Sequence, residues 1–338
     1  MRETLNVLYQ SDDNYAPQTG VSILSMLENN QHFESIHIYV LSDGISKDNL
    51  ARIDQVCSDY GRHLHVIETD DILRELKELN VTPFRGGYTT YFKLLAIDGV
   101  QTDNDLLLQI DGDTIINEPL DGLFDIDLSG KVCAATYECV QNEYKELIGL
   151  KPMEKYYNCG VLWINQAFWR EYQCREKIIK HLTEERSRYF TVDQDIINVL
   201  FRDKIVYLPI AYNVNSGFYV YGIDESFYIY DLDPAYYATK QEVRDAVKHP
   251  IINHCMGPMT GRPWEQDNYH PQNDKYDYYL MMSPWRDIPK ITVNRSRLFK
   301  TQSRLYRTLP RFSYARIHKE VLKRYLRRMD EKSRQGTL

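Results

Sequence analysis

The sequence predicts an α/β protein with a mixed, mainly parallel central sheet flanked by helices, followed by a basic helical extension. Three observations support this prediction. Strand and helix patterns alternate from the start of the chain. A central apolar run ends in two closely spaced aspartates, and the composition changes from about Pro289 onward. The 338 residues, 43% hydrophobic and 26% charged, suffice for one large domain plus an appendage.

The first part of the chain alternates between strand-like and helix-like patterns of apolar residues. Short apolar runs predict strands at residues 5–10, 37–41 and 63–68. Residues 17–30 carry apolar side chains at helical spacing, and Ser46 is a good N-cap for a second helix over 47–60. This strand–helix–strand–helix–strand order predicts parallel strand pairing.

The later elements are read in the same way. We expect helices over 88–97, 168–186 and 193–202, and strands over 106–110, 132–137, 160–164, 205–208 and 251–254. Two segments rich in Pro, Gly and Tyr, 209–237 and 257–277, are expected to be long loops. Long loops in a compact domain are usually functional or disordered.

The net charge of -7 conceals an asymmetry. Residues 290–338 contain 15 of the 41 Lys and Arg and only three acids, Glu320, Asp330 and Glu331, a balance of +12. The other residues carry 26 basic and 45 acidic side chains, a balance of -19. The acidic body argues against nucleic acid as a partner, whereas the basic tail favours an anionic one.

The basic tail has apolar residues at near-helical spacing among its Arg and Lys, and Pro310 is expected to separate two helices. The chain therefore divides into a catalytic domain, 1–285, and an amphipathic tail, 286–338. Such a tail suits the anionic surface of a membrane. The alternative is a helical hairpin that docks on the acidic body or on a partner protein.

The cysteines and the hydropathy pattern point to a cytoplasmic protein. None of the six cysteines forms a C-x-x-C pair or a zinc-binding spacing, so we expect reduced thiols. The start of the chain leads straight into a strand pattern, without a signal peptide. No stretch approaches eighteen apolar residues. The tail leaves room for peripheral contact with the inner face of the cell membrane.

The acidic pair Asp111-Gly112-Asp113 is the most informative motif. It follows the apolar run 106–110, so two carboxylates sit where a buried strand ends, the place where open α/β sheets bind ligands. If the backbone turns there, both can reach one hard divalent cation that holds a diphosphate. The alternative is an ordinary turn, because Asp and Gly are common turn residues.

Several further motifs need a common explanation with this pair. The stretches are Ser11-Asp12-Asp13-Asn14-Tyr15, Thr89-Thr90-Tyr91, Asp111-Gly112-Asp113, Tyr157-Asn158-Cys159-Gly160-Val161, Asp193-Gln194-Asp195, His254 with Gly257, and Pro263-Trp264. Their order and spacing resemble glycosyltransferase family 8, which includes bacterial lipooligosaccharide galactosyltransferases and glycogenin. The resemblance extends over about residues 5–265. The resemblance implies a GT-A type fold and transfer of a sugar from a nucleotide donor.

The resemblance implies that Asp111, Asp113 and His254 are metal ligands. Two carboxylates and one imidazole suit Mn²⁺, with Mg²⁺ as a second option, and leave positions for both phosphates of a UDP-sugar. A bound cation would neutralise charge on the departing UDP. Taken alone, a histidine in this position is more often a hydrogen-bonded structural residue.

Other donor contacts follow from the resemblance. Asp12 and Asn14 match contacts to uracil and ribose, and Ser11, Gly112 and Gly257 belong to the same donor-binding motifs. Lys93 stands where many relatives carry Arg or Lys, and it would contact a phosphate or the sugar. Arg262 precedes Pro263-Trp264, where relatives usually have Lys, and could close over the diphosphate. The stretch 257–262 is longer than the corresponding stretch in the family pattern. Arg262 therefore matches the lysine of the relatives less directly than the other motif residues match theirs.

The resemblance assigns the sugar-side chemistry to Asp193 and Gln194, with Glu138 and Asn158 as further sugar contacts. Relatives often have Asp at the position of Glu138. Family members retain the anomeric configuration, but a neutral amide such as Gln194 is a poor nucleophile. We therefore expect a same-face substitution, in which the acceptor hydroxyl attacks from the side that UDP leaves. The Gln194 carbonyl would then stabilise positive charge on the sugar.

The sequence thus predicts a metal-dependent, retaining UDP-hexose glycosyltransferase, with galactose ahead of glucose. The acceptor is expected to be a sugar on a bacterial surface glycan, either lipid-linked or on a glycoprotein adhesin. One alternative is a non-catalytic module that binds a UDP-sugar. A less favoured one is a phosphatase of the haloacid dehalogenase type, which also places D-x-D after a strand. That alternative does not explain His254 or the 193–195 motif.

Overall fold

The computed structural model describes residues 4–84, 87–184, 189 and 191–334. A seven-stranded sheet has the order β3-β2-β1-β4-β7-β6-β8. Its strands are β1 (Thr4–Asp12), β2 (Ser35–Asp43), β3 (His63–Glu68), β4 (Leu106–Ile110), β6 (Cys133–Tyr137), β7 (Tyr157–Asn165) and β8 (Ile205–Tyr207). β7 pairs antiparallel with β4 and β6, while the other neighbours are parallel. The predicted mixed, mainly parallel α/β sheet is confirmed.

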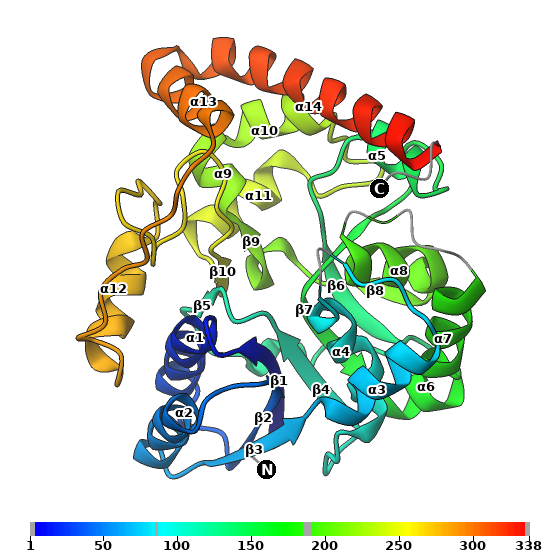
Figure 1. Ribbon diagram of the computed structural model, residues 1–338, viewed down its shortest axis with the longest axis vertical. Coiled ribbons are helices and arrows are strands. Elements are labelled where there is room, and N and C mark those ends of the chain that lie inside the picture. Colours follow the sequence, from blue (N-terminus) through cyan, green and yellow to red (C-terminus); the bar gives the residue numbers. More distant parts are fainter. Residues whose placement is uncertain (1–3, 85–86, 185–188, 190, 335–338) are drawn as a thin grey trace.

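Helices cover both faces of this sheet (Figure 1). One face packs against α1 (Ala16–Asn29) and α2 (Lys47–Asp59). The other packs against α4 (Thr89–Ala96), α6 (Gln166–Glu171), α7 (Cys174–Glu184) and α8 (Val192–Phe201). Strand β1 shows why two layers form, because Leu5, Val7 and Tyr9 enter the first core and Leu8 enters the second.

A second, three-stranded sheet brings distant segments to the end of β4. It consists of β5 (Thr114–Ile116), β10 (Ile252–His254) and β9 (Val214–Asn215), in the order β5-β10-β9. Strand β10 pairs antiparallel with β5, so His254 lies opposite Thr114. This pairing carries the histidine to the acidic pair across about 140 residues of sequence.

The expectations of a loop over 209–237 and of one helix over 168–186 are wrong. The predicted loop 209–237 contains β9 and the short helices α9 (Ser216–Tyr221) and α10 (Ile223–Tyr230), joined at Gly222 with φ +97°. Its aromatic residues fill a core of their own, which composition alone did not reveal. The predicted helix 168–186 is divided at Gln173, whose φ of 54° lies in the left-handed region. Residues 185–186 lie outside the described part of the chain.

Four further short helices were not predicted from the sequence. They are α3 (Asp70–Glu78), α5 (Asn142–Leu147), α11 (Lys240–Lys248) and α12 (Asn273–Met282). Helix α12 begins inside the segment 257–277 that was expected to be a loop, and it packs against α1. Short helices of this kind depend mainly on tertiary packing, because isolated helices of this length are marginal in water.

The basic tail forms α13 (Arg297–Thr308) and α14 (Arg311–Arg334), and Pro310 separates them as predicted. Helix α14 lies along α10 and reaches α5 (Figure 1). Tyr314 and Ala315 are buried against α9 and α10, and Lys319 donates to the carbonyl of Tyr228 at 2.8 Å and pairs with Asp231. The tail is therefore a docked hairpin on one side. Within the described residues, no helix is both long and apolar enough to cross a membrane.

Candidate active site

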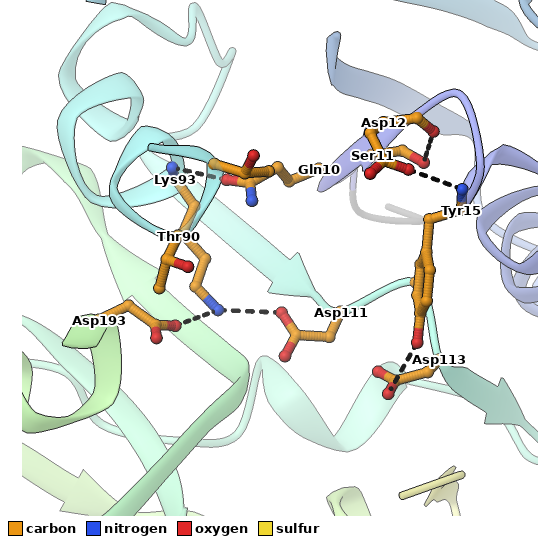
Figure 2. A pocket seen from close by; sticks show the side chains of 11 residues that line it. Gln10, Ser11, Asp12, Tyr15, Thr90, Lys93, Asp111, Asp113 and Asp193 are labelled. Carbon is orange, nitrogen blue, oxygen red and sulfur yellow. Dashed lines mark hydrogen bonds and ion pairs between the residues drawn. The ribbon is translucent and has the colours of Figure 1, made fainter. Parts of the chain in front are cut away.

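The ends of β1 and β4, together with α4 and α8, enclose a polar cleft of about 290 Å³. Figure 2 shows Lys93 directed at Asp111 and Tyr15 directed at Asp113. Among the predicted site residues, the cleft is lined by Ser11, Asp12, Lys93, Asp111, Gly112, Asp113 and Asp193. Gln10, Tyr15, Thr89 and Thr90 complete the lining. The cleft lies where the strands end, as expected for an open α/β sheet.

The backbone turns at Asp111-Gly112-Asp113, as the metal hypothesis requires. The amide of Asp111 donates to the carbonyl of Gly160 at 2.8 Å, which ties the turn to β7. A Cβ on Gly112 would lie 2.2 Å from Oγ1 of Thr19 on α1, so only glycine fits between the turn and the helix. The close packing fixes where the two carboxylates point.

Asp113 is held by three side chains from distant segments. Its Oδ1 lies 3.1 Å from Nε2 of His254, and Tyr15 donates to its Oδ2 at 3.2 Å. Arg262 donates to the hydroxyl of Tyr15 at 2.7 Å and lies 4.0 Å from Asp113. Burial alone would raise the pKa of Asp113, but His254 and Arg262 hold this pKa below its usual range. The carboxylate is therefore ionised.

One ligand atom from each of Asp111, Asp113 and His254 lies within 4.8 Å of the others. This is the spacing at which three groups can share one ion. Two hard carboxylate oxygens and an imidazole nitrogen suit Mn²⁺, and three protein ligands leave coordination positions for substrate oxygens. The arrangement fits a divalent cation.

Lys93 bridges the acidic pair and the 193–195 motif. Its ammonium lies 2.9 Å from Asp111 and 2.6 Å from Asp193, and it donates to the carbonyl of Cys159 at 3.2 Å (Figure 2). The lysine is only 5% exposed. Burial acts to lower its pKa, but the two carboxylates outweigh burial and raise it. A permanently charged ammonium thus separates two carboxylates at the base of the cleft.

The predicted nucleotide contacts lie on both sides of the turn after β1. Asp12 accepts from the backbone N–H of Tyr15 at 2.8 Å and so closes this turn at the rim of the cleft. Asn14 is exposed and faces a neighbouring apolar pocket of about 210 Å³, which Trp264 also lines. Gly257 packs against Arg262, because a Cβ there would lie 2.6 Å from Cγ of the arginine.

Glu138 and Asn158 form one polar network beside His254. Asn158 donates to the Glu138 carboxylate, which also accepts from Asn215 at 3.0 Å. Oδ1 of Asn158 accepts from Asn213 at 2.7 Å, and Asn213 lies 3.0 Å from Nδ1 of His254. Glu138 is therefore part of an internal network rather than a free surface acid.

Gln194 and Asp195 extend from the first turn of α8. Oε1 of Gln194 accepts from the N–H of Cys159 at 3.1 Å, and its Nε2 donates to Tyr156 at 3.2 Å. Asp195 is fully buried and accepts from the hydroxyls of Tyr144 and Tyr156. The amide of Gln194 thus has a fixed orientation, with one lone pair of Oε1 left for another partner.

Sequence reasoning missed three residues whose side chains contact those of predicted metal ligands. Gln109, inside β4, donates to Oδ1 of Asp111 at 3.0 Å. Tyr15 belongs to the first matching stretch but was assigned no role, although a polar residue inside a matched motif was an available signal. Asn213 lies in the segment that was expected to be a loop, and nothing in the local sequence distinguishes it. Only the pairing of β9 with β10 places it beside His254.

Replacing Gly160 by Ala is expected to weaken binding of a divalent cation by at least about 10-fold, the range seen when metal-site geometry is disturbed. A Cβ at this position would lie 2.4 Å from Cε1 and 2.8 Å from Nδ1 of His254, so the imidazole must move. Mn²⁺ titration calorimetry checks this result. Gly99→Ala is the matched control, because no atom lies within 4 Å of its Cβ position. Equal Mn²⁺ affinity in the two variants would contradict the prediction.

Comparison with known proteins agrees with this geometry. The family model for glycosyl transferase family 8 matches residues 6–268. The chain is 24% identical over 298 residues to general stress protein A of Bacillus subtilis, covering 87% of this chain and 99% of that protein. It is 27% identical over 291 residues to a lipopolysaccharide 1,2-glucosyltransferase of Escherichia coli, covering 84% of this chain and 80% of that protein.

A solved structure shares the same fold. The galactosyltransferase LgtC, in complex with donor and acceptor sugar analogs, superposes with a TM-score of 0.64 at 21% sequence identity, covering 88% of this chain and 99% of that one. The architecture is therefore of the GT-A type that the resemblance implied. Because the family model spans far more than half of the residues, the chain belongs to glycosyltransferase family 8.

Proposed function

We propose that this glycosyltransferase moves a hexose from a UDP-sugar to a sugar acceptor, with retention of configuration and with the help of Mn²⁺. The observation that carries the proposal is the convergence of Asp111, Asp113 and His254 beside the cations of Lys93 and Arg262. Such a site matches a donor with a diphosphate next to a neutral sugar. When bound, the divalent cation supplies Lewis-acid stabilisation of the departing diphosphate.

Different side chains along the cleft are proposed to bind different parts of the donor. Asp12 at its rim and Asn14 just outside it are proposed to bind uracil and ribose. Arg262 is half-buried and is proposed to bind the diphosphate, for which a guanidinium is well suited. Ser11, Gly112 and Gly257 keep the backbone close to the donor.

The hexose is proposed to lie between Lys93, Asp193 and the network of Glu138 and Asn158. In a same-face substitution, the acceptor hydroxyl approaches from the side that the diphosphate leaves. The free lone pair on Oε1 of Gln194 would then face the developing positive charge. The Glu138 carboxylate, already fixed by two amides, would accept hydrogen bonds from sugar hydroxyls.

Galactose is the favoured hexose, followed by glucose, and the two differ only at the 4-hydroxyl, which one or two hydrogen bonds distinguish. Lipopolysaccharide glucosyltransferase and galactosyltransferase LgtC among the relatives support a hexose donor and a surface-glycan acceptor. An adhesin-linked glycan is the second acceptor class. Membership of family 8 leaves no support for the phosphatase alternative, because the matched region spans the whole cleft.

The function is tested by UDP release from a panel of UDP-sugars, with Mn²⁺ and with EDTA. Slow hydrolysis of one donor that stops in EDTA is the expected result, and it names the sugar. If no donor is hydrolysed, UDP and Mn²⁺ binding is measured by calorimetry. Binding without turnover in the presence of glycan acceptors would favour the non-catalytic module, and no binding would refute the donor site.

The division into a catalytic domain, 1–285, and a tail, 286–338, is part of the proposal, as is a peripheral position at the inner face of the membrane. The outward side of α14 exposes Arg316, Arg324, Arg327 and Arg328, with Phe312 and Ile317 also exposed. Helix α13 adds Leu298, which is 65% exposed. Basic and apolar groups on one open surface suit an anionic lipid interface.

Replacing the basic residues of this surface is expected to release the protein from lipid. Each basic residue near an anionic bilayer contributes about 1 kcal/mol, so the triple variant Arg324→Ala, Arg327→Ala and Arg328→Ala should bind about 100-fold more weakly. Sedimentation with phosphatidylglycerol vesicles measures this.

The matched control for lipid binding removes three exposed basic residues from α2 and α3, namely Lys47, Arg74 and Lys77. This control should sediment like the wild type. Wild-type protein that does not sediment with the vesicles would show that the hairpin serves only to dock on the body.

A further inference from the structure

Asn213 lies between the metal side and the sugar side of the cleft. It immediately precedes β9 and is only 5% exposed. Its amide makes two side-chain contacts: Nδ2 donates to Oδ1 of Asn158 at 2.7 Å, and Oδ1 lies 3.0 Å from Nδ1 of His254. The sequence motifs assign no role to Asn213. It contacts Nδ1 of the imidazole, the nitrogen opposite the one that faces Asp113.

The direction of each hydrogen bond in this chain follows from one backbone group. The N–H of Gly160 can only donate, and it lies 2.7 Å from one atom of the Asn158 amide, which must therefore be the oxygen. Asn213 must present its NH₂ to that oxygen. The oxygen of Asn213 consequently faces His254, so Nδ1 of the imidazole is the donor.

We propose that Asn213 is a positioning residue that holds His254 in the Nδ1-protonated form, with Nε2 directed at the metal position. Nε2 is the atom that lies 3.1 Å from Asp113, the second proposed ligand. The inference rests on the proposed metal-dependent function. A hydrogen-bond acceptor behind a ligating histidine fixes both the tautomer and the ring orientation, and its loss lowers metal affinity about 10- to 100-fold.

The same amide connects the imidazole to the proposed sugar contacts. From Asn213 the network continues through Asn158 to Glu138, and Asn215 holds the other Glu138 oxygen at 3.0 Å. The imidazole packs directly against Gly160, in the space that a side chain would occupy, because a Cβ there would lie 2.4 Å from Cε1 of the ring. His254 is thus held on two sides by groups that do not themselves touch the ion.

The test measures Mn²⁺ affinity of the full chain by loss of the free-ion EPR signal, with and without saturating UDP. Asn213→Ala is expected to weaken Mn²⁺ binding about 10- to 100-fold. Asn213→Asp keeps an acceptor oxygen behind the imidazole but can no longer donate to Asn158, so it is expected to weaken Mn²⁺ binding less than the alanine variant does. If the alanine variant does not fold, Asn213→Leu, which keeps the volume but has no acceptor, takes its place.

Asn253→Ala is the matched control for a general loss of packing. Asn253 is 1% exposed on the neighbouring strand β10, and it also makes two side-chain hydrogen bonds, to Gln272 and from Tyr219. Equal weakening in Asn253→Ala or in Asn213→Asp, or wild-type affinity in Asn213→Ala, would overturn the proposal. Wild-type protein that binds no Mn²⁺ would instead refute the metal site itself, and the positioning role with it.

Discussion

Asp113→Ala is expected to lower kcat/KM for Mn²⁺-dependent UDP release by about 10³-fold, equivalent to about 4 kcal/mol of transition-state stabilisation. Asp113 is the carboxylate on which His254, Tyr15 and Arg262 converge. Its removal deletes one proposed metal ligand and leaves the other contacts without their common partner. The kcat/KM for UDP release is measured with the best donor at saturating Mn²⁺.

Asp287→Ala is the control for this experiment, because that aspartate side chain is 96% exposed and lies outside the cleft. It should keep wild-type turnover. Thermal unfolding of both variants in EDTA establishes that they are folded. A folded Asp113→Ala enzyme with undiminished, EDTA-sensitive turnover would show that the metal is held elsewhere.

Lys93→Met is expected to lower the free energy of unfolding by about 3 kcal/mol, because removal of one partner of a buried ion pair leaves charge uncompensated. The side chain of Lys93 is 7% exposed, and the ammonium contacts both Asp111 and Asp193. We also expect donor turnover to be lost, since two repelling carboxylates would face the donor without a cation between them. Urea unfolding and UDP release measure the two effects.

Two comparisons make this prediction specific. Lys93→Arg retains the charge and should recover most of the stability but not full turnover, because a guanidinium has a different shape. Lys300→Met removes an exposed lysine of α13 and should change neither quantity. Equal stability of Lys93→Met and Lys300→Met would show that the buried pair contributes nothing to folding.

The pH dependence of this effect has a defined sign. The folded state raises the pKa of Lys93 above its ordinary value of 10.5. The stabilisation by this lysine is therefore fully present below pH 10.5 and is lost only as the pH rises through the raised pKa. The stability difference between the wild type and Lys93→Met should be the same at pH 7 and pH 9.

The fold and the acidic pair were accessible from the sequence because both depend on local patterns. Strand and helix periodicity predicted the alternating first half, and the turn after the strand 106–110 identified the acidic pair. The roles of Glu138, Asn158 and Gln194 were carried over from the family resemblance and stay proposals. The structure adds that Glu138 and Asn158 share one network, and that Gln194 is oriented by Tyr156 and Cys159.

Some features could not be predicted because their signals are not local. Phe218, Phe227, Tyr236 and Tyr237 lie in a segment that looks like a loop in composition, yet they are buried together in a hydrophobic cluster with residues of α11. From the sequence, the basic tail was compatible with a helix on a membrane surface and with a docked hairpin. Burial of Tyr314 and Ala315 shows that one side of the tail packs against the rest of the protein. The outer side keeps the basic and apolar groups on which the lipid proposal rests.

The sequence by itself determined the α/β class, the family and the place of the acidic pair Asp111 and Asp113 at a strand end, because these features can be read from local patterns and their order along the chain. His254 joined this pair only through the family resemblance. Only the tertiary structure decided which of these groups meet. Lys93 reaches Asp193 across 100 residues, and Asn213 reaches His254 across 41. The first contact depends on how α4 and α8 pack against each other, and the second on how β9 pairs with β10. No local pattern along the chain encodes that geometry.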